Sequence, residues 1–313
     1  MRIFYTSINQ MAFLFSLIII GYILMKCHAV PDNTAAVLAK LENTIFIPAL
    51  VIKTFIENFT IERIGPAWRL FLISLIIACI MIPLAILISR LCTKVRYIRN
   101  IYTYGLSFSN FGFMGNAVVS AVFPDIFLEY LIFTLPLWIL IYIWGVPVLL
   151  IPSADKKQTL KENLKAFVNP MFIAMIIGII LGLANIALPS WVGSVVSASG
   201  SCMSPIAMLL TGITVATINM RKVFVEYKIY IVSFVRLILF PLIFIGIFAL
   251  LPFSDTVVIC TVCSLAMPLG LNCIVVPSCY GKDTSIAAGM VIISHLLSCA
   301  SIPLIFLLMT RIL

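Results

Sequence analysis

Long apolar stretches alternate with short polar loops along the whole chain. Ten such stretches can be delimited, each of about 20 residues, the length at which a helix crosses the hydrocarbon core of a bilayer. Their approximate ranges are 8–26, 36–56, 67–90, 101–123, 127–150, 170–188, 191–216, 227–251, 256–279 and 286–310. A strand of a membrane barrel would need only about 10 residues of alternating polarity. The pattern therefore predicts an all-α membrane protein with ten transmembrane helices.

One longer hydrophilic segment, residues 153–169, divides the ten stretches into two sets of five. This predicts a first five-helix repeat at 1–152, a linker, and a second five-helix repeat at 170–313. Of the 313 residues, 63% are hydrophobic and 10% charged, and the mean hydropathy is +1.21. A soluble domain of this size cannot bury so much apolar surface, so the expected surrounding is a lipid bilayer. The first stretch lacks a strong basic segment before it and exceeds signal-peptide length, so we expect no cleavable signal.

The net charge of +9 comes from basic residues in the short loops. On alternate loops, one side of the membrane collects most of them: Lys26, Lys40, Arg90, Lys94, Arg96, Arg99, Lys156, Lys157, Lys161, Lys165, Arg221, Lys222, Lys228 and Lys282. The other side holds Arg2, Lys53, Arg63, Arg69 and Arg311. This bias predicts a multi-pass protein of the cell membrane, with the linker in the cytoplasm and both termini outside. The charge is thus a topology signal, and we expect no nucleic-acid partner.

The two halves of the chain resemble each other at an offset near 157 residues. The matched pairs are Ile19–Leu24 with Ile176–Leu181, Pro48 with Pro205, Pro83 with Pro241, and Asn116 with Asn272. Stretches five and ten match less well, because Pro136 pairs with Pro303 only at an offset of 167. Since five is an odd number, the second copy enters the membrane from the opposite side. Inverted repeats of this kind are typical of secondary transporters, whose sites form at broken helices near the midplane.

The fourth and ninth stretches contain residues that interrupt a helix. They are Asn110, Gly112, Gly115 and Asn116 in the fourth, and Pro268, Gly270 and Asn272 in the ninth. Glycine permits non-helical dihedrals, and proline removes an amide donor. Two broken helices that cross would bring half-helix N-termini together, where unpaired N–H groups and side-chain amides can bind a carboxylate. These seven residues are the predicted substrate site. The alternative is that small and polar residues merely let helices pack closely.

Ionisable residues within the apolar stretches are candidates for function. Arg236 lies about midway along the eighth stretch, and could neutralise an anionic substrate or pair with a helix C-terminus. His295 in the tenth could carry a coupling proton, or could simply be a packed, hydrogen-bonded histidine. Glu42 and Lys53 lie toward the two ends of the second stretch, where we expect their side chains to reach an interface. Glu129 is expected in solvent.

Motifs for enzyme chemistry, metal binding or ATP hydrolysis do not occur in the sequence. Cys260 and Cys263 form a C-x-x-C pair without the further ligands of a zinc site, and His28 and His295 are the two histidines. We therefore expect no enzyme, no metal and no cofactor. Energy for transport would come from an H+ or Na+ gradient, or from the gradient of the substrate itself.

The interrupted stretches resemble the auxin efflux carrier family. The resemblance rests on Asn110-x-Gly112-Phe113-Met114-Gly115, on Pro268-x-Gly270-x-Asn272 and on Tyr280-Gly281, and extends over the whole chain. It implies a dimerising scaffold from stretches one, two, six and seven, a moving domain from the other six, and a crossover of helices four and nine. Prokaryotic relatives are described as malate, malonate or other organic-anion permeases. Where the family usually has a proline, this chain has Ala117.

The sequence thus predicts a homodimeric secondary transporter of a small organic anion. Two alternative functions are also compatible with the sequence. A sodium-coupled bile-acid-type or arsenite-type carrier would share the crossover architecture, and sodium dependence would identify it. A non-transporting membrane sensor or receptor would bind its ligand without flux.

Overall fold

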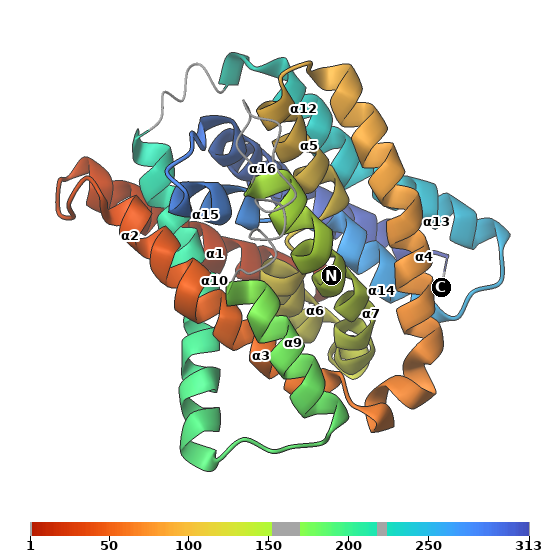
Figure 1. Ribbon diagram of the computed structural model, residues 1–313. Coiled ribbons are helices and arrows are strands. Elements are labelled where there is room, and N and C mark those ends of the chain that lie inside the picture. Colours follow the sequence, from red (N-terminus) through yellow and green to blue (C-terminus); the bar gives the residue numbers. More distant parts are fainter. Residues whose placement is uncertain (1, 152–169, 218–223, 313) are drawn as a thin grey trace.

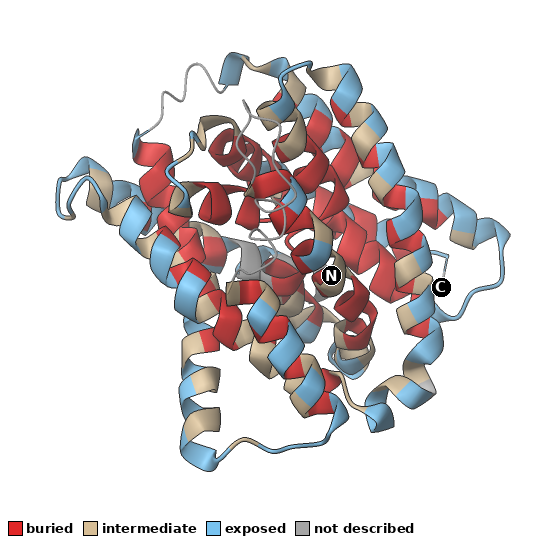
Figure 2. Cartoon of the chain, in the orientation of Figure 1, coloured by how far each residue is buried: buried red, intermediate tan, exposed pale blue. Residues whose placement is uncertain are grey.

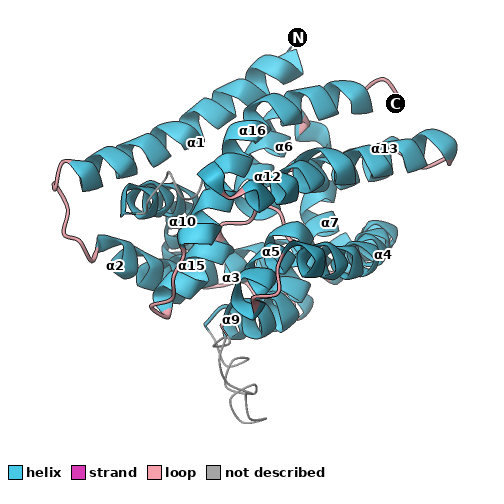
Figure 3. Cartoon of the chain, turned by 90° about the horizontal axis from the view of Figure 1, so that it is seen from above, coloured by secondary structure: helices cyan, strands magenta, loops and turns pink. Residues whose placement is uncertain are grey.

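The computed structural model describes residues 2–151, 170–217 and 224–312. These residues form helices joined by short loops, and apart from one isolated β-bridge they contain no β-strand (Figures 1 and 3). The predicted linker, 153–169, lies outside the described ranges. In the first half the helices are α1 (Arg2–Lys26), α2 (Thr34–Leu41), α3 (Ile47–Asn58), α4 (Ile61–Cys92), α5 (Arg96–Ser107), α6 (Asn116–Val122) and α7 (Phe127–Leu140).

The second half contains α9 (Pro170–Leu183), α10 (Ser190–Thr217), α12 (Tyr227–Phe234), α13 (Phe240–Leu250), α14 (Asp255–Ala266), α15 (Asn272–Cys279) and α16 (Ser285–Met309). Four wider, π-helical segments occur: η1 (Glu42–Phe46), η2 (Phe111–Gly115), η4 (Ile141–Leu150) and η5 (Val235–Leu239); η3 (Pro124–Ile126) is a short 3₁₀ turn. Each of the ten predicted stretches coincides with one or more of these helices.

Six helical segments of the described chain are long and apolar enough to cross a membrane. They are Thr34–Asn58, Ala67–Cys92, Pro124–Leu150, Ser190–Thr217, Tyr227–Leu250 and Ser285–Met309. Shorter apolar helices occur at Ala12–Lys26, Pro170–Leu183 and Asp255–Ala266. The fourth and ninth stretches do not qualify as continuous spans because their helices are interrupted. The chain is therefore a multi-pass helical membrane protein.

The helices form two groups. In the first group α1 packs along α10, and α3 packs against α9 and α10. The contact between α1 and α10 is a backbone contact, since a Cβ on Gly21 would overlap the carbonyl of Leu209, and one on Gly212 would overlap that of Ile18. Small residues permit such close approach of membrane helices. The second group contains α4, α5, α7, α12, α13, α14 and α16, while α15 packs mainly on α2.

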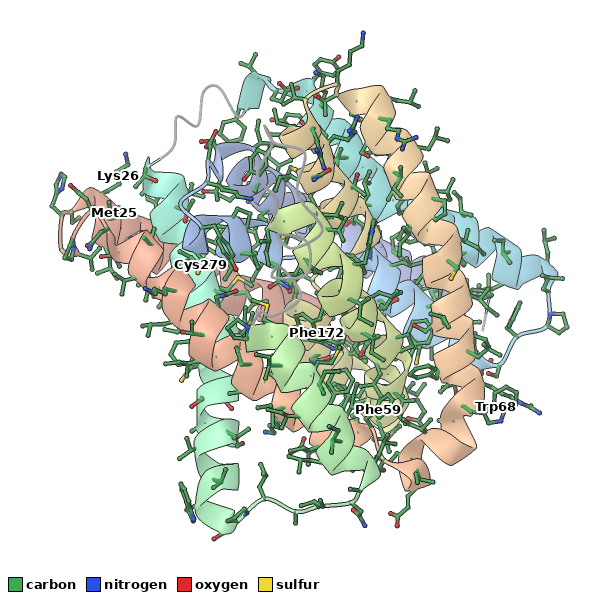
Figure 4. The ribbon with its side chains drawn as sticks, viewed as in Figure 1. Met25, Lys26, Phe59, Trp68, Phe172 and Cys279 are labelled. Atoms are coloured by element: carbon green, nitrogen blue, oxygen red, sulfur yellow. The ribbon has the colours of Figure 1, made fainter. Side chains whose placement is uncertain are left out.

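Buried residues gather in the centre of the molecule and exposed ones on its outer helix faces (Figure 2). The outer face of α4 is apolar, with Ile80, Leu87 and Leu91 exposed. Apolar side chains on an outer surface are what a lipid-facing helix presents. Figure 4 shows Trp68 near the start of α4 pointing away from the molecule. Aromatic side chains at helix ends are typical of the membrane interface.

Candidate functional site: the crossing of two broken helices

The first break lies between α5, which ends at Ser107, and η2, which begins at Phe111. Phe108 leaves the helix with φ −124° and ψ 114°, an extended conformation. Asn110 then caps the new helix: its side-chain oxygen lies 3.5 Å from the amide nitrogen of Met114, a long contact. Asparagine is among the preferred residues at this position. The break predicted in the fourth stretch thus lies just before Asn110, whose side chain caps the helix that follows.

The second break separates α14, which ends at Ala266, from α15, which begins at Asn272. Met267 is extended, with φ −69° and ψ 147°. Pro268 contributes to this, because the helical region is disfavoured for a residue before proline. Proline also lacks the N–H that would continue the ladder of α14. This break was predicted in the ninth stretch.

The two breaks meet as an antiparallel pair of extended segments. Ser109 lies opposite Leu269 in an isolated β-bridge. The amide of Asn110 donates to the carbonyl of Pro268 at 2.7 Å, and the amide of Gly270 donates to that of Phe108 at 3.3 Å. Each broken segment thereby provides hydrogen-bond partners for main-chain groups of the other. This is important within a bilayer, where water is not available to bond to them. The crossing of the fourth and ninth stretches is therefore a direct backbone contact.

Arg236, on η5, joins the two half-helices that end at the crossing. Its Nη1 donates to the carbonyl of Leu106 at 2.9 Å, and its Nη2 donates to that of Ser264 at 3.2 Å. Both carbonyls lie in the last turn of their helices, α5 and α14, where acceptors are left unpaired and the dipole is negative. Ser109 Oγ also donates to the Ser264 carbonyl, at 2.6 Å. Of the two roles considered for Arg236, the structure supports pairing with helix C-termini.

His295, on α16, holds the side chain of Asn110. Nε2 of the ring lies 3.2 Å from Nδ2 of Asn110, and Nδ1 lies 2.7 Å from the carbonyl of Val291. In the orientation that turns Oδ1 of Asn110 toward the amide of Met114, Nδ2 donates to Nε2 of the ring and Nδ1 donates to the carbonyl. This arrangement corresponds to a neutral imidazole with the proton on Nδ1. His295 is only 1% exposed, in keeping with a packed, hydrogen-bonded histidine.

Asn272 has one end of its side-chain amide occupied and the other free. Nδ2 donates to Oη of Tyr104 at 3.1 Å, while Oδ1 is buried without a hydrogen-bond partner among the described residues. The two ends of an amide are nearly equal in size, so a half-turn places Nδ2 at the free position while the Tyr104 hydroxyl donates to Oδ1. In either orientation one hydrogen-bonding group of Asn272 remains for a ligand.

Asn272 lines a small space at the crossing. The residues that line it are Tyr104, Ser109, Asn110, Phe111, Gly112, Trp138, Ile141, Gly270, Leu271 and Asn272. Its volume is about 10 Å³, which is about the room that one water needs. Trp138 closes one side, because its ring packs edge-on against Phe111 at 5.2 Å and stacks on Tyr142 at 5.8 Å. A Cβ on Gly112 would overlap the Trp138 ring. The space is thus too small for a carboxylate, which fits only if the surrounding helices move.

The structure brings together only part of the predicted site. Asn110, Gly112, Gly270 and Asn272 line the space, and Pro268 contributes its carbonyl to the crossing. Asn116 is the sixth residue after the first break, whereas Asn272 is the first after the second, so Asn116 lies outside the lining although the sequence pairs the two. Gly115 lies against the hydroxyl of Tyr130 instead. Tyr104 and Trp138 were not predicted, since an aromatic residue in an apolar stretch carries no sequence signal of its own.

Of the charged residues outside the crossing, Glu42 lies elsewhere than predicted. Glu42 is 0% exposed, so the prediction that it reaches an interface is wrong. Lys53 is half-buried and its Nζ donates to Oγ of Ser197 at 2.9 Å. Glu129 is half-buried rather than fully in solvent. With Arg69 it lines a cavity of about 520 Å³ at the beginnings of α4, α7 and α14. This larger cavity lies away from the crossing.

The described residues contain no group of three or more His, Cys, Asp or Glu side chains that could hold a metal ion. No curated protein matches the chain in sequence. The family model described as "Membrane transport protein", that of the auxin efflux carrier family, matches residues 6–306. The match covers both interrupted stretches and nearly the whole chain, and the family consists of transporters rather than enzymes. The chain therefore belongs to the membrane transport protein family of the auxin efflux carriers.

Proposed function

We propose that this protein is a secondary active transporter of a small organic anion such as a carboxylate. The observation that carries the proposal is the free end of the Asn272 amide, since Asn272 lines the small space where two broken helices cross. A buried polar group without a partner costs free energy, about 1–3 kcal/mol in proteins. Its retention at this place fits a role in binding a ligand.

The groups around this space suit a single carboxylate. Helix geometry leaves the first amides of η2 and α15, those of Phe111, Gly112 and Asn272, without acceptors in their own helices. Helix N-termini attract anions through these donors and through the helix dipole. Arg236 is engaged by two main-chain carbonyls, so neutral donors would provide the binding.

Transport in this proposal follows the inverted-repeat scheme, with ten spans in the cell membrane and both termini outside. The group of α1, α3, α9 and α10 would form the scaffold through which two copies dimerise. The second group would move past it and carry the crossing from one side of the membrane to the other. The small volume of the space at the crossing supports this scheme, because a substrate fits there only after a rearrangement.

Substitution of Asn272 tests the site. Asn272→Ala is expected to abolish uptake or efflux in proteoliposomes while the purified protein remains folded. It should also remove ligand-induced thermal stabilisation in a screen of dicarboxylates, amino acids and aromatic acids, since stabilisation follows occupancy. Asn33→Ala is the matched control, because Asn33 is an exposed asparagine whose side chain makes no capping hydrogen bond.

Unaltered transport kinetics in Asn272→Ala would overturn the site assignment. Sodium dependence of the wild-type flux would favour a bile-acid-type or arsenite-type carrier. Tight ligand binding by the wild type without any flux would favour a sensor or receptor.

A further inference from the structure

A buried carboxyl group lies in the second span, outside the crossing. Glu42 is the first residue of η1, the π-helical segment between α2 and α3. Its side chain is 0% exposed, and neither Oε1 nor Oε2 has a hydrogen-bond partner among the described residues. Glu42 follows Thr34, the start of this span, by eight residues, which is about 12 Å along a helix. It is therefore well inside the protein and away from the span's end.

The π-helical segment has a local cause. Pro48 cannot donate to the carbonyl one turn earlier, and its ring would clash with that carbonyl. The chain accommodates this by widening the turn before it, at Glu42–Phe46. Single π-helical turns inside α-helices are frequently found at functional sites. Here the widened turn carries the buried carboxyl.

Five elements pack around η1: α2, α3, α9, α10 and α15. Their titratable side chains are Lys40, Lys53, Glu57, Cys202, Cys273 and Cys279. Lys40, Glu57 and Cys202 are exposed, and Lys53 donates to Ser197. Cys273 donates from its sulfur to the carbonyl of Gly270 at 2.9 Å, and Cys279 is half-buried. In the described part of the chain, the ion pair found is Lys228 with Glu226. No cation among these residues compensates Glu42.

An ionised carboxylate in such a place would be very costly, and buried carboxyls without partners take up a proton instead. A metal cation would need several further oxygen ligands around it. The oxygens of Glu42 have no polar neighbour at hydrogen-bonding distance. The chemistry of the surroundings therefore selects the proton over a metal cation.

We propose that Glu42 carries the coupling proton of the transport cycle. This inference rests on the proposed function. The proton is taken from water on one side of the membrane to form the carboxylic O–H bond, and is released to water on the other side when that bond breaks. Nothing is oxidised or reduced. His295 and Arg236, the residues suggested by the sequence, are engaged at the crossing by Asn110 and by two carbonyls.

The position of Glu42 explains how its proton would be linked to movement. The α2–η1–α3 rod packs on α10 on one side and on α15 on another, and α15 begins with Asn272 of the substrate site. Figures 1 and 3 show α15 beside α2, and Cys279 at the end of α15 lies next to the rod in Figure 4. When α15 moves past η1, the cover over Glu42 changes. Water then reaches the carboxyl, and the proton can exchange.

The first test needs no substrate. Infrared spectroscopy of the purified protein at neutral pH should show a protonated-carboxyl C=O band that shifts in D₂O. Glu42→Gln, which keeps the side-chain size and stays neutral, should lose this band. Glu57→Gln should keep it, because Glu57 is an exposed carboxyl of the same rod. A band that persists in Glu42→Gln would overturn the proposal.

The second test measures coupling in proteoliposomes with radiolabelled malonate, indole acetate and glutamate as probes. In the wild type, an imposed pH gradient should drive accumulation by up to about tenfold per pH unit for one proton per substrate. Glu42→Gln should lose this accumulation but retain exchange of labelled for unlabelled probe without a gradient. Glu57→Gln should behave as the wild type.

The outcomes separate the two proposals. Wild-type flux together with gradient-driven accumulation in Glu42→Gln would overturn the proton role and leave the transporter intact. No flux of any probe by the wild type, with tight binding of one of them, would refute transport and with it the coupling. Glu42→Gln could also bind the probe normally but lose exchange as well as accumulation. Glu42 would then be needed for the conformational change itself rather than for proton coupling, and the proposal would be overturned.

Discussion

At the scale of single residues, the crossing depends on polar side chains that satisfy main-chain groups. Arg236 is 2% exposed and donates to one carbonyl from each half of the protein, Leu106 and Ser264. Its Nε has no partner in the described part of the chain. Hydrogen bonds to charged groups contribute about 1.5–3 kcal/mol each. The desolvation of the guanidinium opposes this gain, so Arg236 serves to fix two helix ends together more than to add net stability.

Removal of Arg236 should weaken the folded protein. Arg236→Met leaves the Leu106 carbonyl without its side-chain donor and the Ser264 carbonyl with Ser109 alone, so we expect a loss of about 2 kcal/mol and a lower melting temperature in detergent. Arg236→Lys should restore part of the loss, because an ammonium group can reach only one of the two carbonyls well. Arg90→Met is the control, since Arg90 is exposed at the end of α4. Equal melting temperatures for Arg236→Met and Arg90→Met would contradict the bridging role.

At the scale of elements, the two broken helices behave as one unit because their backbones touch. Gly270 permits this contact: a Cβ there would lie 3.1 Å from the carbonyl oxygen of Phe108 and 3.3 Å from that of Ser109. Both atoms belong to the paired backbone, which cannot retreat without stretching the bond from the Gly270 amide to Phe108. The glycine in the ninth stretch is thus needed for the crossing itself.

A methyl group at Gly270 should separate the two segments. We expect Gly270→Ala to cost about 1–3 kcal/mol, as overpacking does, and to abolish ligand-induced stabilisation. Gly246→Ala is the matched control in α13, where a Cβ would meet nothing within 4 Å. That substitution should raise stability by up to about 1 kcal/mol through helix propensity. The crossing would not need its glycine if both variants bound ligand and melted like the wild type.

At the scale of the whole molecule, the loop between α15 and α16 ties the two halves of the chain together. Nζ of Lys282 donates to the carbonyls of Leu150 and Ile151 at 3.0 and 2.6 Å, at the end of η4. It also lies over the ring of Tyr97, whose hydroxyl donates to the carbonyl of Asp283 at 2.8 Å. A positive charge at a helix C-terminus is favourable. This loop therefore links the second half of the chain to the end of η4 in the first half.

Burial lowers the pKa of Lys282 to about 8 from an unperturbed value of 10.5. Between these two values the unfolded chain holds the proton and the folded chain does not, so the contribution of Lys282 to stability should rise with pH. Below pH 8 both states are protonated and this contribution is constant. Melting curves of the wild type and of Lys282→Met, compared from pH 7 to 10.5, should therefore diverge only above pH 8. Parallel curves over the whole range would argue against the lowered pKa.

Much of the architecture follows from the sequence. The apolar stretches coincide with helices, because a backbone in lipid must satisfy its own hydrogen bonds. Both breaks lie where Asn110, Gly112 and Pro268 predict them, because proline, glycine and asparagine act on their own backbone. The offset near 157 residues pairs Asn116 with Asn272, but the structure places them at different distances from the breaks. An offset between matched residues does not show where the helix after each break begins. In the fourth stretch η2 lies between the break and α6, whereas no such segment precedes α15 in the ninth.

What the sequence determined by itself was local: which segments are helices, which helices break, and which family the chain resembles. The tertiary structure decided which polar groups find partners. It gave Arg236 two carbonyls and His295 the amide of Asn110, left one end of the Asn272 amide free, and buried Glu42. The physical reason is that secondary structure depends on neighbours along the chain. Burial and hydrogen bonding of a side chain depend instead on helices that lie more than a hundred residues away in sequence.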